Sequence, residues 1–549
     1  MLCLSSRSEP SAGRLALPLL ACLLGALGAR NAAAADVEVT GDVVTQGYEV
    51  RSPWGDVVLD RRRVTTTMGL SAYHLQGDYQ PLEADYSMRL MMRMDADFGM
   101  DGSETEYGGA RSTRFVPGLE RAPTDVLYGY VEGRNLWGGW FGFRAGRQYT
   151  TDVLGWWSFD GATVRLTTPW FVQLEAYGGL EQRGGLPLSS SRFESQGVWR
   201  GSRSDLVGAQ ELYPSFQQAE HAPGFGLALE SDGPNWVHGR LTYRRVYDLG
   251  DSTTGQFPGV NGQYPSMSGT RISQDRLGYA MSAFLPEVGG VRGSFVYDFY
   301  NMLVSEAQGG LDVSIGSQVT VGADVDYVVP IFDGDSIWNW FVHDPSTTAQ
   351  ARVAVRPLER LELSASGGVR LWSAAGDPAT FAQQECAAIG LASGAALANC
   401  LAQGIDPMNE AVHETGHKEE AAHTNVVPDI LANLGASYGW GTGKASLRAL
   451  GEFGVPTPEI YRGRRVGGEL GARQALDGGR YWLGGSVNLY EWDDPLRAGR
   501  EVTSFGYVLA PEYVPAELAR LRLERQHDMN ELVGSRFRLL AVVQLQVLR

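Results

Sequence analysis

The sequence predicts an all-β protein, a transmembrane antiparallel β-barrel of about 18 strands (roughly 16 to 20) with long extracellular loops. Three observations lead to this prediction. Apolar side chains recur with a period of two along most of the chain, an export signal is present without a spanning helix, and arginines gather on the non-apolar face of the strands.

Residues 86–98 show the period of two most clearly. Met88, Leu90 and Met92 fall on one face of an extended segment, whereas Arg89 and Arg93 fall on the other. Successive side chains of a strand leave opposite faces of the pleated backbone. A segment of this length, tilted, can cross a bilayer with its apolar face toward lipid.

Similar segments recur along the whole chain and are separated by short turns or by long polar connections. The predicted strands lie near 59–76, 84–98, 125–134, 138–148, 160–167, 169–178, 223–231, 235–247, 275–285, 289–303, 308–315, 318–329, 349–356, 360–373, 429–439, 443–453, 463–474, 479–492, less regularly 502–510, and 535–547. The segment 515–525 is helix-like and precedes the last strand, where it is expected to be either a loop helix or a periplasmic plug. The long connections 99–123, 180–222, 249–272, 330–347 and 374–428 are rich in Gly, Pro, Ser and acids.

A soluble β-sandwich or propeller would also alternate. The strands are long, however, and aromatic side chains stand near their ends, as in the interfacial girdles of membrane barrels. Candidates for such a girdle include Trp140, Phe141, Trp156, Trp157 and Trp170.

The N-terminus has the features of a cleavable signal peptide at 1–35. Arg7 and Arg14 precede an apolar run over 15–27, and small residues end at 33–35. The run is short for a spanning helix. Residues 36–58 are then a periplasmic lead-in or a first strand, and 59–549 form the barrel in the Gram-negative outer membrane.

The formal charge of −17 over 549 residues argues against a nucleic-acid partner, which requires a basic face. Arginines nevertheless lie within strands, opposite the apolar set. Those predicted to face the lumen are Arg89, Arg93, Arg144, Arg165, Arg240, Arg244, Arg292, Arg352, Arg356, Arg370 and Arg448. Arginine in a pore wall favours anions; alternatively, these arginines pair with lumen acids and brace the wall.

One pair of neighbouring segments carries a motif. Gly146-Arg147-Gln148 is followed by Phe159-Asp160-Gly161 and Arg165, a pattern that resembles the "GRQ … FDG … R" of alginate-export-type porins. The resemblance covers about 125–180. It implies an 18-stranded monomeric barrel with an arginine-lined lumen for an anionic solute or polysaccharide, and it makes Arg147 a further lumen candidate. Pairing of Arg147 with Asp160 to hold the turn is the other interpretation.

The longest connection, 374–428, contains two further features. His413, Glu414 and His417 match H-E-x-x-H, and His423 stands where a third zinc ligand would follow. Charged neighbours and the absence of a Met-turn favour a solvated loop over a hydrolase site. Cys386 and Cys400 remain after cleavage of the leader and are expected to form a disulfide in an oxidising compartment.

We therefore predict a non-enzymatic outer-membrane porin or exporter without a cofactor. Its expected partners are outer-membrane lipid or lipopolysaccharide, a small anionic solute or polysaccharide, and divalent cations at the acidic loops. The alternatives are a closed barrel that serves as an anchor or interaction protein, and a barrel whose zinc-binding loop is hydrolytic.

Overall fold

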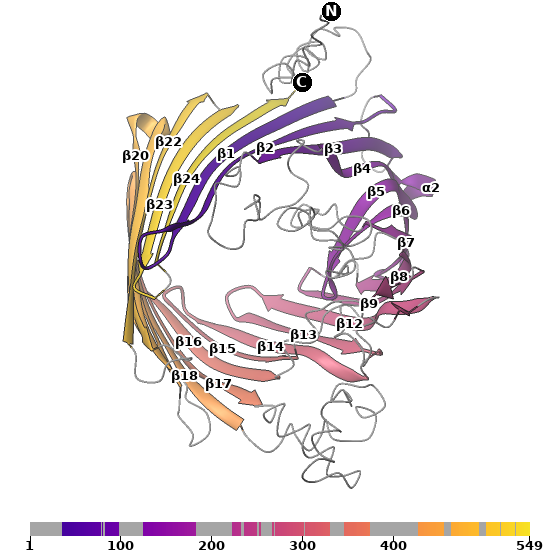
Figure 1. Ribbon diagram of the computed structural model, residues 1–549. Helices are drawn as coiled ribbons and strands as arrows, with labels where there is room; N and C mark the ends of the chain where they lie inside the picture. The colour runs from indigo at the N-terminus through magenta and orange to yellow at the C-terminus, as the bar shows by residue number, and fades with distance from the viewer. Residues whose placement is uncertain are drawn as a thin grey trace, which may run out of the picture.

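The computed structural model contains one closed antiparallel sheet of 22 strands, which forms a ring in Figure 1. The structure describes residues 36–77, 80, 83–97, 124–182, 222–231, 235–249, 252–253, 266–267, 270–300, 302–329, 345–373, 426–454, 463–493, 501–516, 518–532 and 534–548. Among these residues no helix is both long and apolar enough to span a bilayer.

The barrel strands are long, most of them with ten or more residues. They are β1 (Asp36–Arg51), β2 (Val57–Tyr73), β3 (Asp85–Asp97), β4 (Thr124–Asn135), β5 (Phe141–Asp152), β6 (Gly155–Thr167), β7 (Val172–Glu181), β8 (Pro223–Ser231), β9 (Val237–Asp248), β12 (Arg271–Leu285), β13 (Gly289–Asp298), β14 (Leu303–Ile315), β15 (Val319–Val328), β16 (Ser346–Leu358), β17 (Leu361–Ser373), β18 (Val426–Trp440), β19 (Gly443–Gly454), β20 (Arg464–Leu476), β21 (Tyr481–Asp493), β22 (Glu501–Ala516), β23 (Ala519–Asn530) and β24 (Gly534–Leu548).

Four small elements complete the described structure. A two-stranded sheet, β10 (Ser252–Thr253) with β11 (Ser266–Met267), lies in the connection between β9 and β12. Two short helical turns, α2 (Leu136–Gly139) and η2 (Asp477–Gly479), connect β4 to β5 and β20 to β21.

The ring closes between the first and the last strand. Each barrel strand pairs with its neighbours in the chain, and β1 pairs with β24 from Glu38↔Leu548 to Arg51↔Ser535. In Figure 1 the indigo β1 runs beside the yellow β24. Closure gives every strand two partners, which removes the unpaired edge that a bilayer cannot hydrate.

The two rims of the barrel differ in their connections. The longest connections, 98–123, 182–222, 249–270, 329–345 and 374–425, all join strand ends at one rim, which we call the loop rim. The opposite rim, which we call the turn rim, has mostly short connections and contains the ends of the barrel at Asp36 and Leu548. Long loops outside and short turns inside are typical of bacterial outer-membrane barrels.

The barrel prediction is confirmed, but the predicted strand number, like the 18 strands implied by the resemblance, is wrong: the ring has 22 strands. Two differences explain much of the deficit. Asp36–Arg51, which the sequence left open as a lead-in or a strand, is the strand β1, and most of the helix-like segment 515–525 belongs to β23. Leucine and arginine favour helices when isolated, but pairing with β22 and β24 overrides that preference here.

The outer face of the ring is apolar. In β21, for example, Leu483, Val487 and Leu489 share one face and are about half exposed. Val487 pairs with Leu470 in β20, and Gly485, which lies on the same face of β21, pairs with Leu509 in β22; both leucines are exposed. Paired residues of an antiparallel sheet point to the same side, so the exposed apolar residues form a continuous outer belt.

Two facing glycines allow a sharp bend in the β5–β6 hairpin. Gly146 in β5 pairs with Gly161 in β6, and Gly146 has φ = 126°. A Cβ at Gly146 would overlap the carbonyl oxygen of Gly129, and one at Gly161 would overlap that of Gly178. Only glycine tolerates this backbone conformation and this close approach together.

We expect Gly146→Ala to lower the free energy of unfolding by about 2 kcal/mol or more, because it adds backbone strain and a steric overlap. Denaturant unfolding of the refolded barrel measures the change. Gly47→Ala is the matched control, since a Cβ at Gly47 has no heavy atom within 4 Å. Equal losses in both variants would contradict the proposed role of Gly146.

Candidate functional site: the inner wall

The inner face of the ring is polar and contains the arginines that the sequence placed opposite the apolar set. In β3, Met88 is exposed on the outer face, so Arg89 and Arg93 point inward. Arg89 pairs with Tyr130 across the β3–β4 ladder and lies 5.3 Å from the ring centre of Tyr73. The strand register places these further predicted arginines on the same inner face: Arg144, Arg165, Arg240, Arg244, Arg292, Arg352, Arg356, Arg370 and Arg448.

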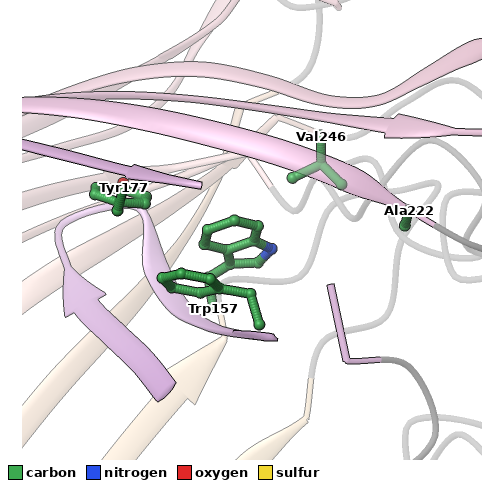
Figure 2. Close-up of a cluster of buried hydrophobic side chains, with 5 residues drawn as sticks. Trp157, Tyr177, Ala222 and Val246 are labelled. Atoms are coloured by element: carbon green, nitrogen blue, oxygen red, sulfur yellow. The ribbon is translucent and has the colours of Figure 1, made fainter. Parts of the chain in front are cut away.

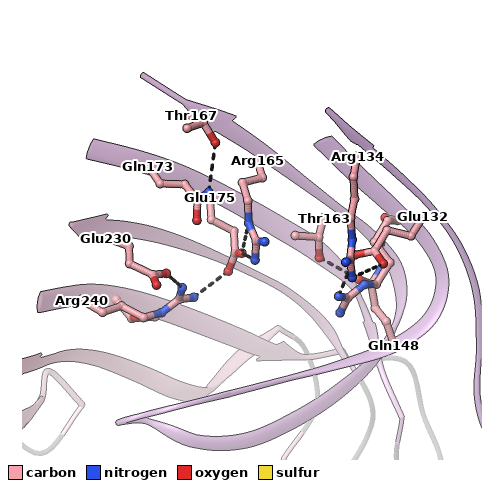
Figure 3. A network of polar contacts seen from close by, with 12 residues as sticks. Glu132, Arg134, Gln148, Thr163, Arg165, Thr167, Gln173, Glu175, Glu230 and Arg240 are labelled. Carbon is pink, nitrogen blue, oxygen red and sulfur yellow. Dashed lines mark hydrogen bonds and ion pairs between the residues drawn. The ribbon is translucent and has the colours of Figure 1, made fainter. Parts of the chain in front are cut away.

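A first group of charges surrounds Glu132 on β4, which is almost completely buried. Arg134 and Arg144 approach its two carboxylate oxygens at 2.7 and 3.1 Å. The guanidinium of Arg144 also lies 4.7 Å from the ring centre of Tyr130. Figure 3 shows Arg134 beside Glu132. One buried carboxylate therefore holds two arginines against the wall.

A second group links four neighbouring strands. Glu175 on β7 accepts hydrogen bonds from Arg165 on β6 at 2.7 Å and from Arg240 on β9 at 2.6 Å. Arg240 also contacts Glu230 on β8 at 2.5 Å, as Figure 3 shows. Because the carboxylates and guanidiniums alternate, their charges are largely compensated within the group.

A third group is a square of two arginines and two aspartates on β13 to β16. Arg292 and Arg352 each contact both Asp312 and Asp324, with 2.8 Å between Arg292 and Asp312. Gly310 and Gly322 lie between these side chains in the register, and a Cβ at either glycine would overlap them. Because Gly310 and Gly322 have no side chain, the four charged side chains of the square can lie over them.

Other predicted arginines differ in their partners. Arg356 contacts Glu362 at 3.0 Å in an exposed pair, and Arg370 contacts Glu452 at 3.2 Å. Within the described part of the chain, no carboxylate lies at ion-pair distance from Arg89 or Arg448. Pairing therefore compensates most, but not all, of the arginines on the inner wall.

The tip of the β5–β6 hairpin folds into the ring and rests on the inner wall. Arg244, on β9, donates to the carbonyl oxygen of Leu154 at 2.6 Å and lies 4.0 Å from the carboxylate of Asp152. Arg244 is completely buried and also donates to Gln274 on β12 at 2.6 Å. A Cβ at Gly278 on β12 would overlap Val153 and Leu154. The tip therefore lies over β9 and β12, which are three and four strands away from β6 in the ring.

An apolar cluster fills the space between the tip and the wall. Trp157 and Phe159 stack at 4.2 Å and pack against Tyr177, Val246 and Ala222. Figure 2 shows the Trp157 indole beside Tyr177 and below Val246. The prediction of Trp157 as an interfacial girdle residue is wrong, because the inward fold of the hairpin buries it inside the ring.

The motif residues hold the bend from which the tip departs. Arg147 forms two hydrogen bonds with Asp160, at 2.7 and 2.9 Å, and donates to the carbonyl oxygen of Val126 at 2.9 Å. Gln148, which is buried, donates to the carbonyl oxygen of Gly161 at 3.0 Å. Arg147 points to the opposite face of β5 from Arg144, so it does not join the inner row of arginines.

Sequence reasoning missed a further group of inward arginines near the seam of the ring. Glu524 on β23 contacts Arg522 and Arg538 at 2.7 Å each, and Arg536 contacts Asp528 at 2.7 Å. Glu512 on β22 likewise contacts Arg520, and it also contacts Arg473 on β20, which the sequence does place on the face opposite the apolar set. The alternation of Arg520, Arg522 and Glu524 with Leu521 and Leu523 was the available signal, but the helical interpretation of 515–525 concealed it.

The candidate metal and disulfide residues lie outside the described residues. These are His413, His417 and His423, and Cys386 and Cys400. Within the part of the chain that the structure describes, no group of three or more His, Cys, Asp or Glu side chains could hold a metal ion.

Comparisons with known proteins give a structural likeness alone. No protein-family model matches the sequence, and no curated protein matches it either. A crystal structure of Pseudomonas aeruginosa OpdK with vanillate is 10% identical, with a TM-score of 0.38, over 94% of this chain and 99% of that chain. Acinetobacter baumannii OccAB1 is 8% identical, with a TM-score of 0.39, over 94% of this chain and 96% of that chain.

We expect Arg244→Ala to lower the free energy of unfolding by about 3 kcal/mol, because it leaves a buried carboxylate and a buried carbonyl without their partner. Arg356→Ala is the control: it removes an exposed ion pair and should cost less than about 1 kcal/mol. Denaturant unfolding measures both values. A loss for Arg244→Ala no greater than that of the control would show that Arg244 does not anchor the tip.

Proposed function

We propose that this protein is an outer-membrane diffusion channel for small polar solutes. The observation that supports this most directly is the division of the closed 22-stranded ring into an apolar outer face and a charged inner face. A closed ring satisfies its backbone hydrogen bonds internally, as a lipid environment requires. Charged side chains on the inner face require water or ion pairs around them, which a hydrated lumen provides.

The position of the long connections supports an orientation. By analogy with bacterial barrels, the loop rim faces outward and the turn rim faces the periplasm. A leader at 1–35 would direct the chain through the inner membrane to this destination. Since β1 and β24 close the ring within one chain, a monomer is sufficient to form the channel.

We further propose that the channel prefers anions, and that this preference comes from a few arginines rather than from all of them. Groups with equal numbers of arginines and carboxylates, such as Arg165 and Arg240 with Glu175 and Glu230, contribute little net field at a distance. Among the described residues no carboxylate lies at ion-pair distance from Arg89 or Arg448, although Glu469 is the cross-strand partner of Arg448, so their charge is only partly compensated and acts on the lumen. Arginine that is not compensated attracts anions into a pore.

Acids on the inner wall limit this preference. Glu306 and Asp326 lie close together on β14 and β15, and in the described structure neither contacts an arginine. In the ring order, β14 and β15 lie nine and ten positions from β3, and five and four positions from β19. The lumen is therefore locally basic and locally acidic, so that a moderate anion preference follows rather than a strict one.

The solute belongs to the class of small anions or anionic polysaccharides that the arginine pattern suggested. The β5–β6 tip occupies part of the lumen and narrows the route along β7 to β12. A solute would pass beside this tip. On the β3 and β5 side of the bend, away from β9 and β12, it would meet Arg89 and Arg144.

We expect an anion-selective reversal potential across a KCl gradient in a planar bilayer. Arg89→Gln with Arg448→Gln should move the chloride-to-potassium permeability ratio toward one, because each change removes a positive charge that no ion pair neutralises from the lumen wall. Glu306→Gln is the reciprocal control and should raise the same ratio.

Two outcomes would contradict the proposal at different levels. Conductance without a response to these three substitutions would exclude the arginine-based preference while keeping the channel. Absence of conductance in a correctly folded, inserted barrel would favour a closed barrel that acts as an anchor or interaction protein.

A further inference from the structure

One outward-facing site on β22 to β24 does not fit a purely apolar lipid belt. Leu521 and Leu523 on β23 are exposed on the outer face, and Arg525 and His527 follow with the same period of two. The cross-strand partners of Arg525 are Leu509 and Leu539, which are also exposed outer residues. Arg525 therefore points away from the lumen, toward the membrane.

The environment of Arg525 differs from that of the inward arginines on the same strand. Arg522, which points inward, contacts Glu524 at 2.7 Å. Within the described residues, no carboxylate lies at ion-pair distance from Arg525; its neighbours are aromatic rings instead. Its guanidinium carbon lies 5.8 Å from the ring centre of Tyr507 and 5.5 Å from that of Phe537.

The two rings show the direction in which the Arg525 side chain extends. Tyr507 and Phe537 are the cross-strand partners of His527, which is nearer to the loop rim than Arg525. The His527 ring meets both rings edge-on, at 5.8 and 6.2 Å. The Arg525 side chain therefore reaches toward the loop rim, as arginines do when they extend from a lipid-facing position to the interface.

An unpaired arginine is unfavourable on the lipid face, most of all at the midplane of the bilayer and less near the interface. An anion supplied by the lipid would offset this cost. A phosphate fits best, because the planar guanidinium binds its oxygens in a bidentate manner, and His527 offers a second nitrogen beside it.

We propose that Arg525 and His527, framed by Tyr507 and Phe537, bind a phosphate of the phosphorylated glycolipid in the outer leaflet. The leaflet is the outer one because the Arg525 side chain extends toward the loop rim, which we have proposed to face outward.

Arg62 on β2 lies in the same cross-strand row as Arg525, through Gly47 and Leu539, about 14 Å away across three strand spacings. This proposal rests on the membrane placement proposed above.

The test is binding of diphosphoryl lipid A to the refolded full-length protein in a neutral detergent, followed by native mass spectrometry. Lipid A without phosphates and phosphatidylglycerol are compared in parallel. We expect tightest binding of diphosphoryl lipid A, about tenfold weaker binding for Arg525→Gln, and substantial recovery for Arg525→Lys.

Arg465→Gln is the matched control. Arg465 also stacks on an aromatic ring, 4.9 Å from the centre of Tyr490, but it lies on the inner face. This variant should bind lipid A as the unchanged protein does.

Several results would overturn the proposal. The first is equal binding of phosphorylated and dephosphorylated lipid A. The second is an equal loss of lipid A binding in the Arg525→Gln and Arg465→Gln variants. The third is tighter binding of phosphatidylglycerol than of lipid A.

If the Arg525→Gln variant loses self-association without a change in lipid binding, the surface instead binds a second copy of the chain. Conductance of Arg525→Gln in a neutral bilayer is measured separately, so that failure of the channel and failure of the lipid site are distinguishable.

Discussion

Closure of the hydrogen-bonded ring between β1 and β24 is the constraint on which the other features of this structure depend. In lipid, an unpaired strand edge would leave backbone groups without partners, so all 22 strands must pair on both sides. Pairing sets the register, and the register decides which side chains face inward. A slip of one residue would move the inner arginines to the lipid and the leucines to the lumen.

A second constraint is the repulsion among the many arginines on the inner wall, which is reduced by pairing them with carboxylates. Buried Glu132 and Glu175 each hold two arginines, and the square of Arg292, Arg352, Asp312 and Asp324 alternates its charges. Glycines opposite these side chains give them room. Because local pairing compensates most of the charge, the number of lumen arginines is a poor measure of the field that a solute meets. Unpaired positions such as Arg89 matter more.

The inward hairpin tip shows how a local backbone feature changes the interior of a wide barrel. The bend at Gly146 and Gly161 allows β5 and β6 to leave the wall, and the Arg147–Asp160 pair holds the bend. Arg244 and the Trp157 cluster then fix the tip against β9 and β12. A ring of 22 strands is wide, and this tip supplies an internal obstacle built from the wall itself.

The sequence by itself determined the barrel class and the face of most strand residues, because a period of two has a direct structural meaning: alternate residues point in and out. It predicted Arg89, Arg165 and Arg240 on the inner face for this reason. Only the tertiary structure decided the number of strands, since β23 has the composition of a helix and becomes a strand through its neighbours. It also decided the partners of each arginine and the inward position of Trp157, because contacts between strands distant in sequence, such as β6 with β9, leave no local periodicity to read.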